Sequence, residues 1–308
     1  MNMLRLQSPV YTIDNELLLP QGTVLSSSTI DILVSSGKIV SQKKFSLLRH
    51  ATVKKDIRHF LGRPPYDIIF SGKGKITALF DLMSKVQLPR PLLRSLDYFY
   101  QNDFDTYRHT LMVFALSILL AKDLIQDRKK LIQEISTGPT HDFGKVCVPL
   151  PILKKNSPLT RNELGILRHH AAAGYVLLCH YLHDTQSLAA RISRDHHERR
   201  DASGYPRGIH LNDHMVEIIA TCDVYDALVS PRPYRLRSYD NRTALEEITR
   251  MAERNQIGWS VVKALVAHYR KAKIHFGETR ISKEKRGIPP PGNLHGIIAD
   301  EGGRSKDV

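Results

Sequence analysis

The sequence predicts a mainly α protein, in which an all-helical domain follows a small α+β domain at the N-terminus. Two observations support this fold class. Segments that alternate apolar and polar residues are confined to the region before about Phe70, and apolar residues at helical spacing dominate from about Thr77 to Phe276. The chain has 308 residues, of which 42% are hydrophobic, so it is long enough to bury a full core and to form two domains.

The first elements are predicted from short local patterns. The stretch VYTIDNELLLPQGTVLS alternates around Asp14 and Asn15 before a turn at 20–22, which is typical of a β-hairpin. The stretch SSSTIDILVSSGKIV then places a serine before apolar residues at helical spacing and a stop at Gly37, which predicts a short helix. We assign residues 1–85 to this domain and expect it to have a regulatory or partner-binding role.

Residues 86–276 are assigned to the helical domain. Its longest apolar run, from Leu111 to Ala121, is too short to span a bilayer and is flanked by charged residues, so we expect a buried core helix and no membrane span. Residues 277–308 contain few apolar side chains, and we expect them to form a loose C-terminal tail.

The charge of the chain limits the possible partners without choosing among them. A formal charge of +14 and a pI near 9.7 favour polyanions, which include nucleic acids, membrane surfaces and phosphorylated small molecules. The basic residues are dispersed, so no nucleic-acid polymer is expected. The N-terminus lacks the apolar segment of a secretory signal, and the three cysteines show no CxxC spacing, which together favour a cytoplasmic protein.

The helical domain contains a set of metal-donor side chains close to predicted helix ends. Adjacent residues diverge by about 100° on a helix, so the neighbouring pairs in this set can share a target only where a helix ends. Imidazoles with carboxylates suit iron, manganese or zinc, and more than four donors indicate two metals. The alternative, for one such histidine alone, is a hydrogen-bonded core residue. The donors are His109, His141, Asp142, His170, His196, His197 and Asp223.

Three motifs carry a resemblance to a known family. They are HDFGK from His141, HHERRDASGYP from His196, and DVYDALVSPRPYR from Asp223. In this order they resemble the HD superfamily of metal-dependent phosphohydrolases, and more closely its HD-GYP branch. The resemblance extends over roughly residues 103–269.

The resemblance implies an HD-type helical domain that hydrolyses cyclic di-GMP to linear pGpG, and in some members onward to GMP. A hydroxide that bridges two divalent metal ions is expected to attack the phosphorus atom. Iron is the expected metal, with manganese, nickel and zinc as alternatives. The resemblance assigns His109, His141, Asp142 and Asp223 to the first metal, and Asp142, His170, His196 and His197 to the second.

Other positions acquire roles by the same resemblance. Asp142 and Lys145 are the expected catalytic residues, and Lys145, Arg232 and Arg235 are expected to bind substrate phosphates. Without the resemblance, the two arginines would be assigned to the surface of a loop that contains prolines. The loop of Gly204, Tyr205 and Pro206 is a possible contact for protein partners.

Four acidic residues lie near the motifs, and three of them have two interpretations. Asp105 lies one turn before His109 on the same helix face, where it could approach the metals without binding them directly or could cap the helix. Asp195 and Glu198 flank the histidine pair and either orient the rings or face solvent. Asp226, three residues after Asp223, is expected to anchor the arginine loop.

Three functions therefore remain open. The first is a cyclic di-GMP phosphodiesterase. The second is a catalytically weak sensor that binds a cyclic dinucleotide or a partner protein. The third is an HD phosphohydrolase that acts on another nucleotide.

Overall fold

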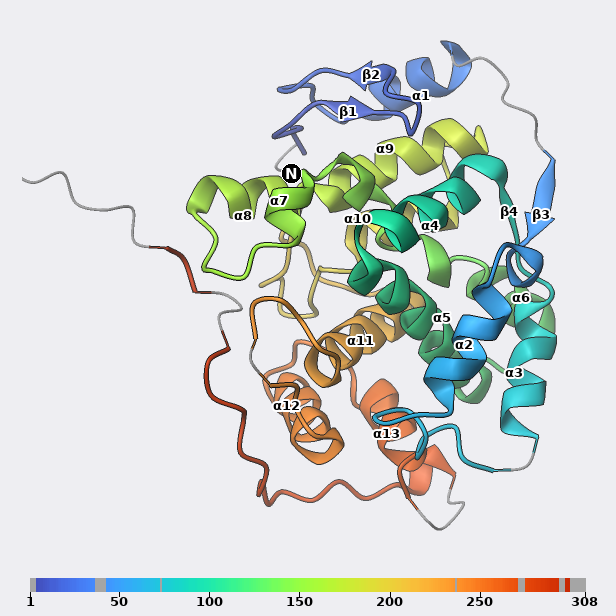
Figure 1. The fold of residues 1–308 in the computed structure, drawn as a ribbon, viewed down its shortest axis with the longest axis vertical. Coiled ribbons are helices and arrows are strands. Elements are labelled where there is room, and N and C mark those ends of the chain that lie inside the picture. Colours follow the sequence, from blue (N-terminus) through green and yellow to red (C-terminus); the bar gives the residue numbers. More distant parts are fainter. Residues whose placement is uncertain are drawn as a thin grey trace, which may run out of the picture.

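The computed structural model describes residues 4–36, 43–72, 74–235, 237–270, 275–293 and 297–299. The fold is mainly α, as predicted, with two short two-stranded sheets in this part of the chain (Figure 1). The elements before the long central helix are β1 (Val10–Tyr11), β2 (Leu17–Leu19), α1 (Ser27–Ser36), β3 (Lys44–Ser46), η1 (Leu47–Arg49), α2 (Val53–Leu61), α3 (Lys75–Met83), β4 (Gln87–Pro89) and α4 (Arg90–Asn102). The elements from that helix onward are α5 (Phe104–Leu124), α6 (Arg128–Ile135), η2 (Gly138–Thr140), η3 (Phe143–Cys147), α7 (Leu150–Leu153), α8 (Arg161–Arg168), α9 (His170–Leu182), α10 (Leu188–Asp195), α11 (His214–Val229), α12 (Asn241–Glu253), α13 (Trp259–Ala267) and η4 (Phe276–Glu278).

The predicted hairpin and the helix that follows it are confirmed. Strands β1 and β2 pair antiparallel, with Val10 opposite Leu19. Helix α1 begins after Ser26, whose Oγ accepts a hydrogen bond from the backbone N–H of Thr29 at 3.1 Å, as expected of a serine cap. The predicted stop at Gly37 lies outside the described residues. The hairpin and α1 lie against α9, which is visible beneath them in Figure 1.

The segment between α1 and α4 packs against the helical part of the chain. Strand β3 pairs antiparallel with β4, and helices α2 and α3 both contact α5. One continuous hydrophobic cluster extends from Leu6 to Leu265 and includes residues on both sides of position 85. The boundary near residue 85 therefore stays a prediction, and the core itself continues across it.

Helix α5 forms the centre of the fold. All residues from Leu111 to Ala121 are buried, which confirms the expectation of a core helix. Among the described residues, no helix is both long and apolar enough to cross a membrane. Helices α2, α3, α4, α6, α11 and α13 all pack against α5 and surround the apolar run.

The segment that carries His141 and Asp142 differs from the prediction. The donors were expected close to helix ends, but this pair lies between two 3₁₀ turns, and Gly144 lies inside the second, η3. A Cβ at Gly144 would be 1.9 Å from the carbonyl oxygen of His170 and 2.4 Å from the nitrogen of Gly174. The glycine is therefore required by the close approach of α9, and it brings two metal-donor segments together.

The C-terminal segment also differs from the predicted loose tail. Glu246 of α12 accepts hydrogen bonds from the backbone N–H groups of Arg286 (3.1 Å) and Gly287 (2.7 Å), and Lys285 pairs with Glu253 at 2.8 Å. Apolar content did not predict this contact, because two carboxylates of α12 hold the segment, of which Glu246 is buried and Glu253 is exposed. Residues 275–293 therefore contact the surface of the helical part.

Candidate metal centre

The first group of donors comes from α5, α11 and the turn before η3. One ligand atom from each of His109, His141 and Asp223 lies within 4.8 Å of the others. The Nε2 atom of His109 is 3.0 Å from Oδ1 of Asp223. Helices α5 and α11 pack together, so their contact places these two residues side by side.

The second group comes from the start of α9 and the end of α10. His170 is the first residue of α9, and His196 and His197 follow the last residue of α10. The Nε2 atom of His170 is 3.1 Å from Nε2 of His197 and 3.5 Å from Nε2 of His196. The predicted placement at helix ends explains how two neighbouring imidazoles face one point.

Asp142 lies between the two groups. Its Oδ2 is 3.4 Å from Nε2 of His109 and 3.5 Å from Nε2 of His141. Its Oδ1 is 3.4 Å from Nε2 of His170 and 3.9 Å from Nε2 of His196. Each carboxylate oxygen therefore faces one donor group, and the structure brings all seven predicted donors into one cluster, in which His197 is half-buried and the others are buried.

In four of the five imidazoles, Nδ1 lies at hydrogen-bonding distance from an oxygen acceptor. An imidazole whose Nδ1–H donates a hydrogen bond has its Nε2 lone pair free to bind a metal. The Nδ1 atoms face Asp226 Oδ2 for His109 (2.7 Å), the Gly138 carbonyl for His141 (3.0 Å), the Leu167 carbonyl for His170 (2.7 Å) and the Ser193 carbonyl for His196 (2.8 Å). The Nε2 atom of His141 is buried without a hydrogen-bond partner, as a ligand atom awaiting a cation would be.

Burial keeps most of these imidazoles neutral. It lowers the pKa of His141 and His197, and it lowers the pKa of His170 and His196 to about 4. Neutral imidazole is the form that binds metals. His109 differs, since burial and Arg232 oppose its protonation but hydrogen bonds to three aspartates raise its pKa to about 9.

The carboxylates at the centre are ionised. Burial alone would raise the pKa of Asp142, but the charge of Lys145 and the hydrogen bond from His109 hold it well below its usual range. The pKa of Asp223 is likewise held low, against burial, by the hydrogen bond from His109. The Nζ atom of Lys145 is 2.6 Å from Oδ2 of Asp142, so this predicted catalytic lysine lies at the cluster.

The two predicted phosphate-binding arginines occupy different places. One Nη atom of Arg232 lies 2.9 Å from Nδ1 of His109 and 3.4 Å from Oδ2 of Asp226. Because this Nδ1 donates to Asp226 and cannot also accept, we assign the Arg232 contact to the carboxylate. Arg235 is turned away: one Nη atom donates to the carbonyls of residues 227, 228 and 230 at 2.6 to 2.8 Å and fixes the loop backbone.

Sequence reasoning assigned to Asp226 only the arginine loop, and it missed the group around this residue. Asp226 is fully buried, accepts the Nδ1–H of His109, and also accepts a hydrogen bond from the Tyr66 hydroxyl. Ser230 and Arg108 complete the group, with Arg108 donating to the Ser230 hydroxyl at 2.6 Å. Asp226 could be found from its spacing to Asp223, but no local signal identifies Tyr66.

The loop after His197 is held by ring contacts. The Tyr205 ring stacks on His197 with centroids 4.4 Å apart, and Arg168 covers its other face at 4.9 Å. A Cβ at Gly204 would be 2.3 Å from the carbonyl oxygen of His197, so only glycine allows the loop to return this closely. Tyr205 therefore packs against the ring face of His197 and supports this imidazole.

Both interpretations of Glu198 and Asp195 are wrong. Glu198 is fully buried and accepts the backbone N–H groups of Arg207 (2.7 Å) and Ile209 (3.1 Å), so it holds the loop and orients no ring. Asp195 is also buried, and it pairs with Arg194 and Arg207 at 2.8 Å.

Asp105 does not cap the helix that carries His109. The cap is Asp103, whose carboxylate accepts the backbone N–H of Thr106 at 3.3 Å. Asp105 is half-buried in the first turn, and its charge is one of those that raise the pKa of Arg232 against the effect of burial. Among the described contacts it makes no hydrogen bond to the seven donors, so a position near the metals without direct contact stays a prediction.

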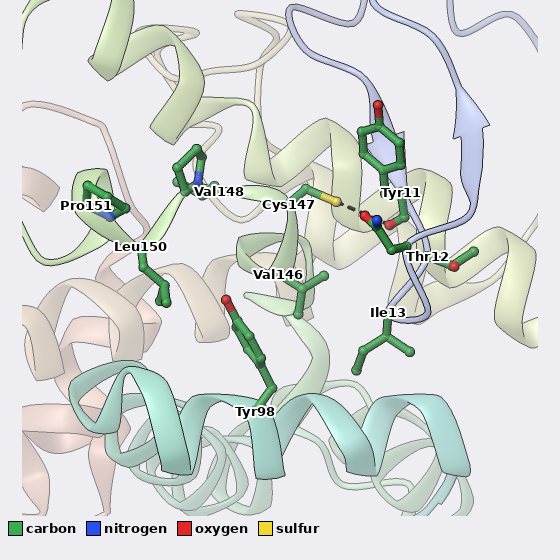
Figure 2. Close-up of a pocket in the computed structure, with 11 residues that line it drawn as sticks. Tyr11, Thr12, Ile13, Tyr98, Val146, Cys147, Val148, Leu150 and Pro151 are labelled. Atoms are coloured by element: carbon green, nitrogen blue, oxygen red, sulfur yellow. Dashed lines mark hydrogen bonds between the residues drawn. The ribbon is translucent and has the colours of Figure 1, made fainter.

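A cavity of about 490 Å³ lies beside the centre and contains none of the predicted donors. Its lining comes from the hairpin, α4 and the segment after Lys145, and Figure 2 shows Tyr98, Val146 and Leu150 around it. Cys147 Sγ donates to the Tyr11 carbonyl at 3.4 Å across one side. The cavity is mostly apolar and uncharged, so the chemistry is at the donor cluster.

Comparison with known proteins identifies the family. A family model described as an HD domain matches residues 106–261, which is half of the chain. The cyclic di-GMP phosphodiesterase PA4108 of Pseudomonas aeruginosa is 38% identical over 183 residues, which are 58% of this chain and 42% of that protein. A cyclic di-GMP phosphodiesterase of Thermotoga maritima is 36% identical over 153 residues, 49% of this chain and 40% of that protein. The 3'3'-cGAMP-specific phosphodiesterase 1 of Vibrio cholerae is 39% identical over 136 residues, 42% of this chain and 30% of that protein.

The fold and the site define a helical protein with a histidine- and aspartate-rich centre that can hold metal. The chain belongs to the HD-domain family, in its HD-GYP branch. It spans less than half the length of each of these three relatives.

Proposed function

We propose that the chain is a metal-dependent phosphodiesterase that hydrolyses cyclic di-GMP to linear pGpG, and in a second step to GMP. The observation that carries this proposal is the position of Asp142, whose two oxygens each face a separate group of buried donors at 3.4 to 3.9 Å. An arrangement of this kind is suited to two metal ions that share one carboxylate. The names of the relatives support the choice of substrate.

The donor set fits two divalent ions. His109, His141, Asp142 and Asp223 would hold one ion, and Asp142, His170, His196 and His197 would hold the other. The orphaned Nε2 of His141 and the neutral state of His170 and His196 support this assignment. We propose iron first and manganese, nickel or zinc as alternatives, because mixed imidazole and carboxylate donors accept each of them. When bound, such ions would activate water and neutralise charge on phosphate oxygens.

The residues of the chain supply the rest of the chemistry. Lys145 has three N–H donors and uses one on Asp142, so two others are available for phosphate oxygens. Arg232 adds a permanent positive charge beside His109. Arg235 is left out of the substrate site, because its described contacts hold the loop backbone.

We also propose a cellular location and a partner-binding loop. Cys147, Cys179 and Cys222 are free, which supports the reducing cytoplasm. The loop of residues 204–206 is proposed as a contact for a protein partner. Its ring stack on His197 would pass a change at that surface to the metal centre.

The proposal is tested by a hydrolysis assay with protein purified without oxygen and loaded with iron or manganese. We expect cyclic di-GMP to be converted to pGpG, and the conversion to stop after chelation. The Asp142→Asn variant is the matched inactive control. Metal-loaded protein that binds cyclic di-GMP without converting it would favour a sensor, and conversion of another nucleotide alone would favour a different phosphohydrolase.

One alternative substrate has specific support. The Vibrio cholerae relative with 39% identity is named for 3'3'-cGAMP, which differs from cyclic di-GMP in one base. We therefore include 3'3'-cGAMP in the assay at the same concentration. A higher kcat/KM for 3'3'-cGAMP would keep the reaction class and change the substrate.

A further inference from the structure

We propose that Tyr66 is a positioning residue, by which the chain before the HD domain holds the metal donor His109 in place. The inference rests on the metal centre of the proposed function and is independent of the substrate. It concerns a part of the chain that the family model does not match, since that match begins at residue 106.

Tyr66 lies in the loop between α2 and α3 and reaches into the centre of the fold. Its side chain is 2% exposed. The hydroxyl donates to Oδ1 of Asp226 and lies 2.9 Å from Oγ of Ser230. Burial and the charge of Asp226 raise the pKa of Tyr66 well above its usual value, so the phenol stays protonated and remains a donor.

Asp226 links Tyr66 to the metal centre. Its Oδ1 faces the phenol, and its Oδ2 accepts the Nδ1–H of His109 at 2.7 Å. A carboxylate held at both oxygens has one orientation, and it fixes the ring plane of the imidazole that it contacts. The hydroxyl of Tyr66 therefore restrains the direction of the His109 Nε2 lone pair through two successive hydrogen bonds, with Asp226 between them.

Arg108 does not replace this contact. Its closest Nη atom is 4.0 Å from Oδ1 of Asp226 and is directed to the Ser230 hydroxyl at 2.6 Å. Without the phenol, the contact of Oδ1 that remains among the described residues is the distant charge of Arg108. Because Asp226 is fully buried, its orientation depends on these side chains.

The loop that carries Tyr66 is itself held by the helical part of the chain. Asn241 at the start of α12 donates its side-chain N–H to the carbonyl of Pro65 at 2.9 Å. A displacement of α2 or α3 would move Tyr66 relative to Asp226. The affinity of the metal position that includes His109 would then depend on where this N-terminal segment lies. A partner that moves the segment could therefore regulate metal binding.

The test compares Tyr66→Phe with Tyr107→Phe. Tyr107 is also 2% exposed and donates its hydroxyl to a carboxylate, that of Asp56 at 2.8 Å, which contacts none of the donors. Manganese affinity is measured by competition with a chelator, together with the thermal midpoint of each metal-free variant. We expect Tyr66→Phe to weaken one of two manganese positions by about 10-fold, with the other unchanged. Tyr107→Phe is expected to lower the thermal midpoint similarly and to keep wild-type manganese affinity.

Unchanged manganese affinity in Tyr66→Phe, or an equal loss in Tyr107→Phe, would overturn the inference. If Tyr66→Phe does not fold, Ser230→Ala removes a second hydrogen-bond partner of the phenol, beside Asp226 and the more distant Arg108 at 3.5 Å, and a loss of manganese affinity of about 3-fold is expected at the same position. No loss in Ser230→Ala would then contradict it. Protein that binds manganese but hydrolyses no cyclic dinucleotide would sink the proposed function alone.

Discussion

The position of one proton on each imidazole decides what the donor cluster can bind. Backbone carbonyls of Gly138, Leu167 and Ser193 accept Nδ1–H groups from three histidines, and each carbonyl lies three residues before its histidine. The local turn therefore selects the tautomer. Of the four imidazoles whose Nδ1–H contacts are described, His109 is the one that uses a side chain, which makes its orientation depend on residues distant in the sequence.

Lys145 is predicted to act on the substrate and not on the metals. In Lys145→Ala we expect kcat/KM for cyclic di-GMP to fall about 100-fold, because a charge that stabilises phosphate oxygens is removed. The metal content should not change. Lys155→Ala is the matched control, since Lys155 also pairs with a carboxylate at 2.6 Å, that of Glu163, away from the donors. Loss of metal in Lys145→Ala would show that the lysine is structural.

His169 is predicted to make the metal-free protein sensitive to acid. Burial and the neighbouring His170 lower its pKa to about 4, against an unfolded value near 6.5. Below pH 6.5 His169 becomes protonated in the unfolded chain but stays neutral in the folded chain. The free energy of unfolding therefore falls as the pH drops toward 4. His169→Gln should make this fall shallower by up to about 1.4 kcal/mol per pH unit. Urea titrations from pH 7 to 4.5 measure it, and an unchanged slope would contradict the assignment.

At the scale of the elements, the contact between η3 and α9 brings the two donor groups together. Gly144→Ala should destabilise the protein by about 3 kcal/mol or more, because the added Cβ would overlap the α9 backbone. Gly165→Ala is the control, since its Cβ would meet only the flexible side chain of Gln7 at 3.0 Å. We expect that control to be neutral or slightly more stable, as alanine favours a helix. Equal thermal midpoints for the two variants would refute the packing role of Gly144.

Helix ends show what sequence patterns can and cannot define. The placement of His170, His196 and His197 at helix termini follows from the motifs and is observed. The sequence left open whether Asp105 caps α5 or lies near the metals, and it did not indicate Asp103. The helix begins one residue after Asp103, and only the backbone conformation there selects that carboxylate as the cap.

Across the whole molecule, the metal-donor residues were predictable from the sequence, but the distant residues that hold them in place were not. Five of the seven donors lie in three local motifs, each visible in a single stretch of chain, and His109 and His170 lie outside them. Tyr66 contacts Asp226 across 160 positions, and no local pattern indicates such a pair. The tail was missed for a similar reason, since the buried acceptor Glu246 lies about 40 residues before the backbone groups that it binds.

Glu246 is predicted to hold residues 285–287 against α12. In Glu246→Ala two backbone N–H groups lose their acceptor, so we expect trypsin to cut after Lys285 or Arg286 several-fold faster than in the wild type. Glu247→Ala is the matched control, because Glu247 pairs within α12 with Arg250. Metal content should remain unchanged in both variants. Equal cleavage rates in Glu246→Ala and the wild type would contradict the role of this carboxylate.

The central claim is that Asp142 joins two metal positions in one site, and metal stoichiometry tests it most directly. Protein purified without oxygen should contain two divalent ions per folded chain by elemental analysis, and Asp105→Ala should still contain two. Asp142→Ala should lose both, because each of its oxygens faces one group of donors. Three ions in the wild type with one lost in Asp105→Ala, or two ions retained in Asp142→Ala, would contradict the shared site.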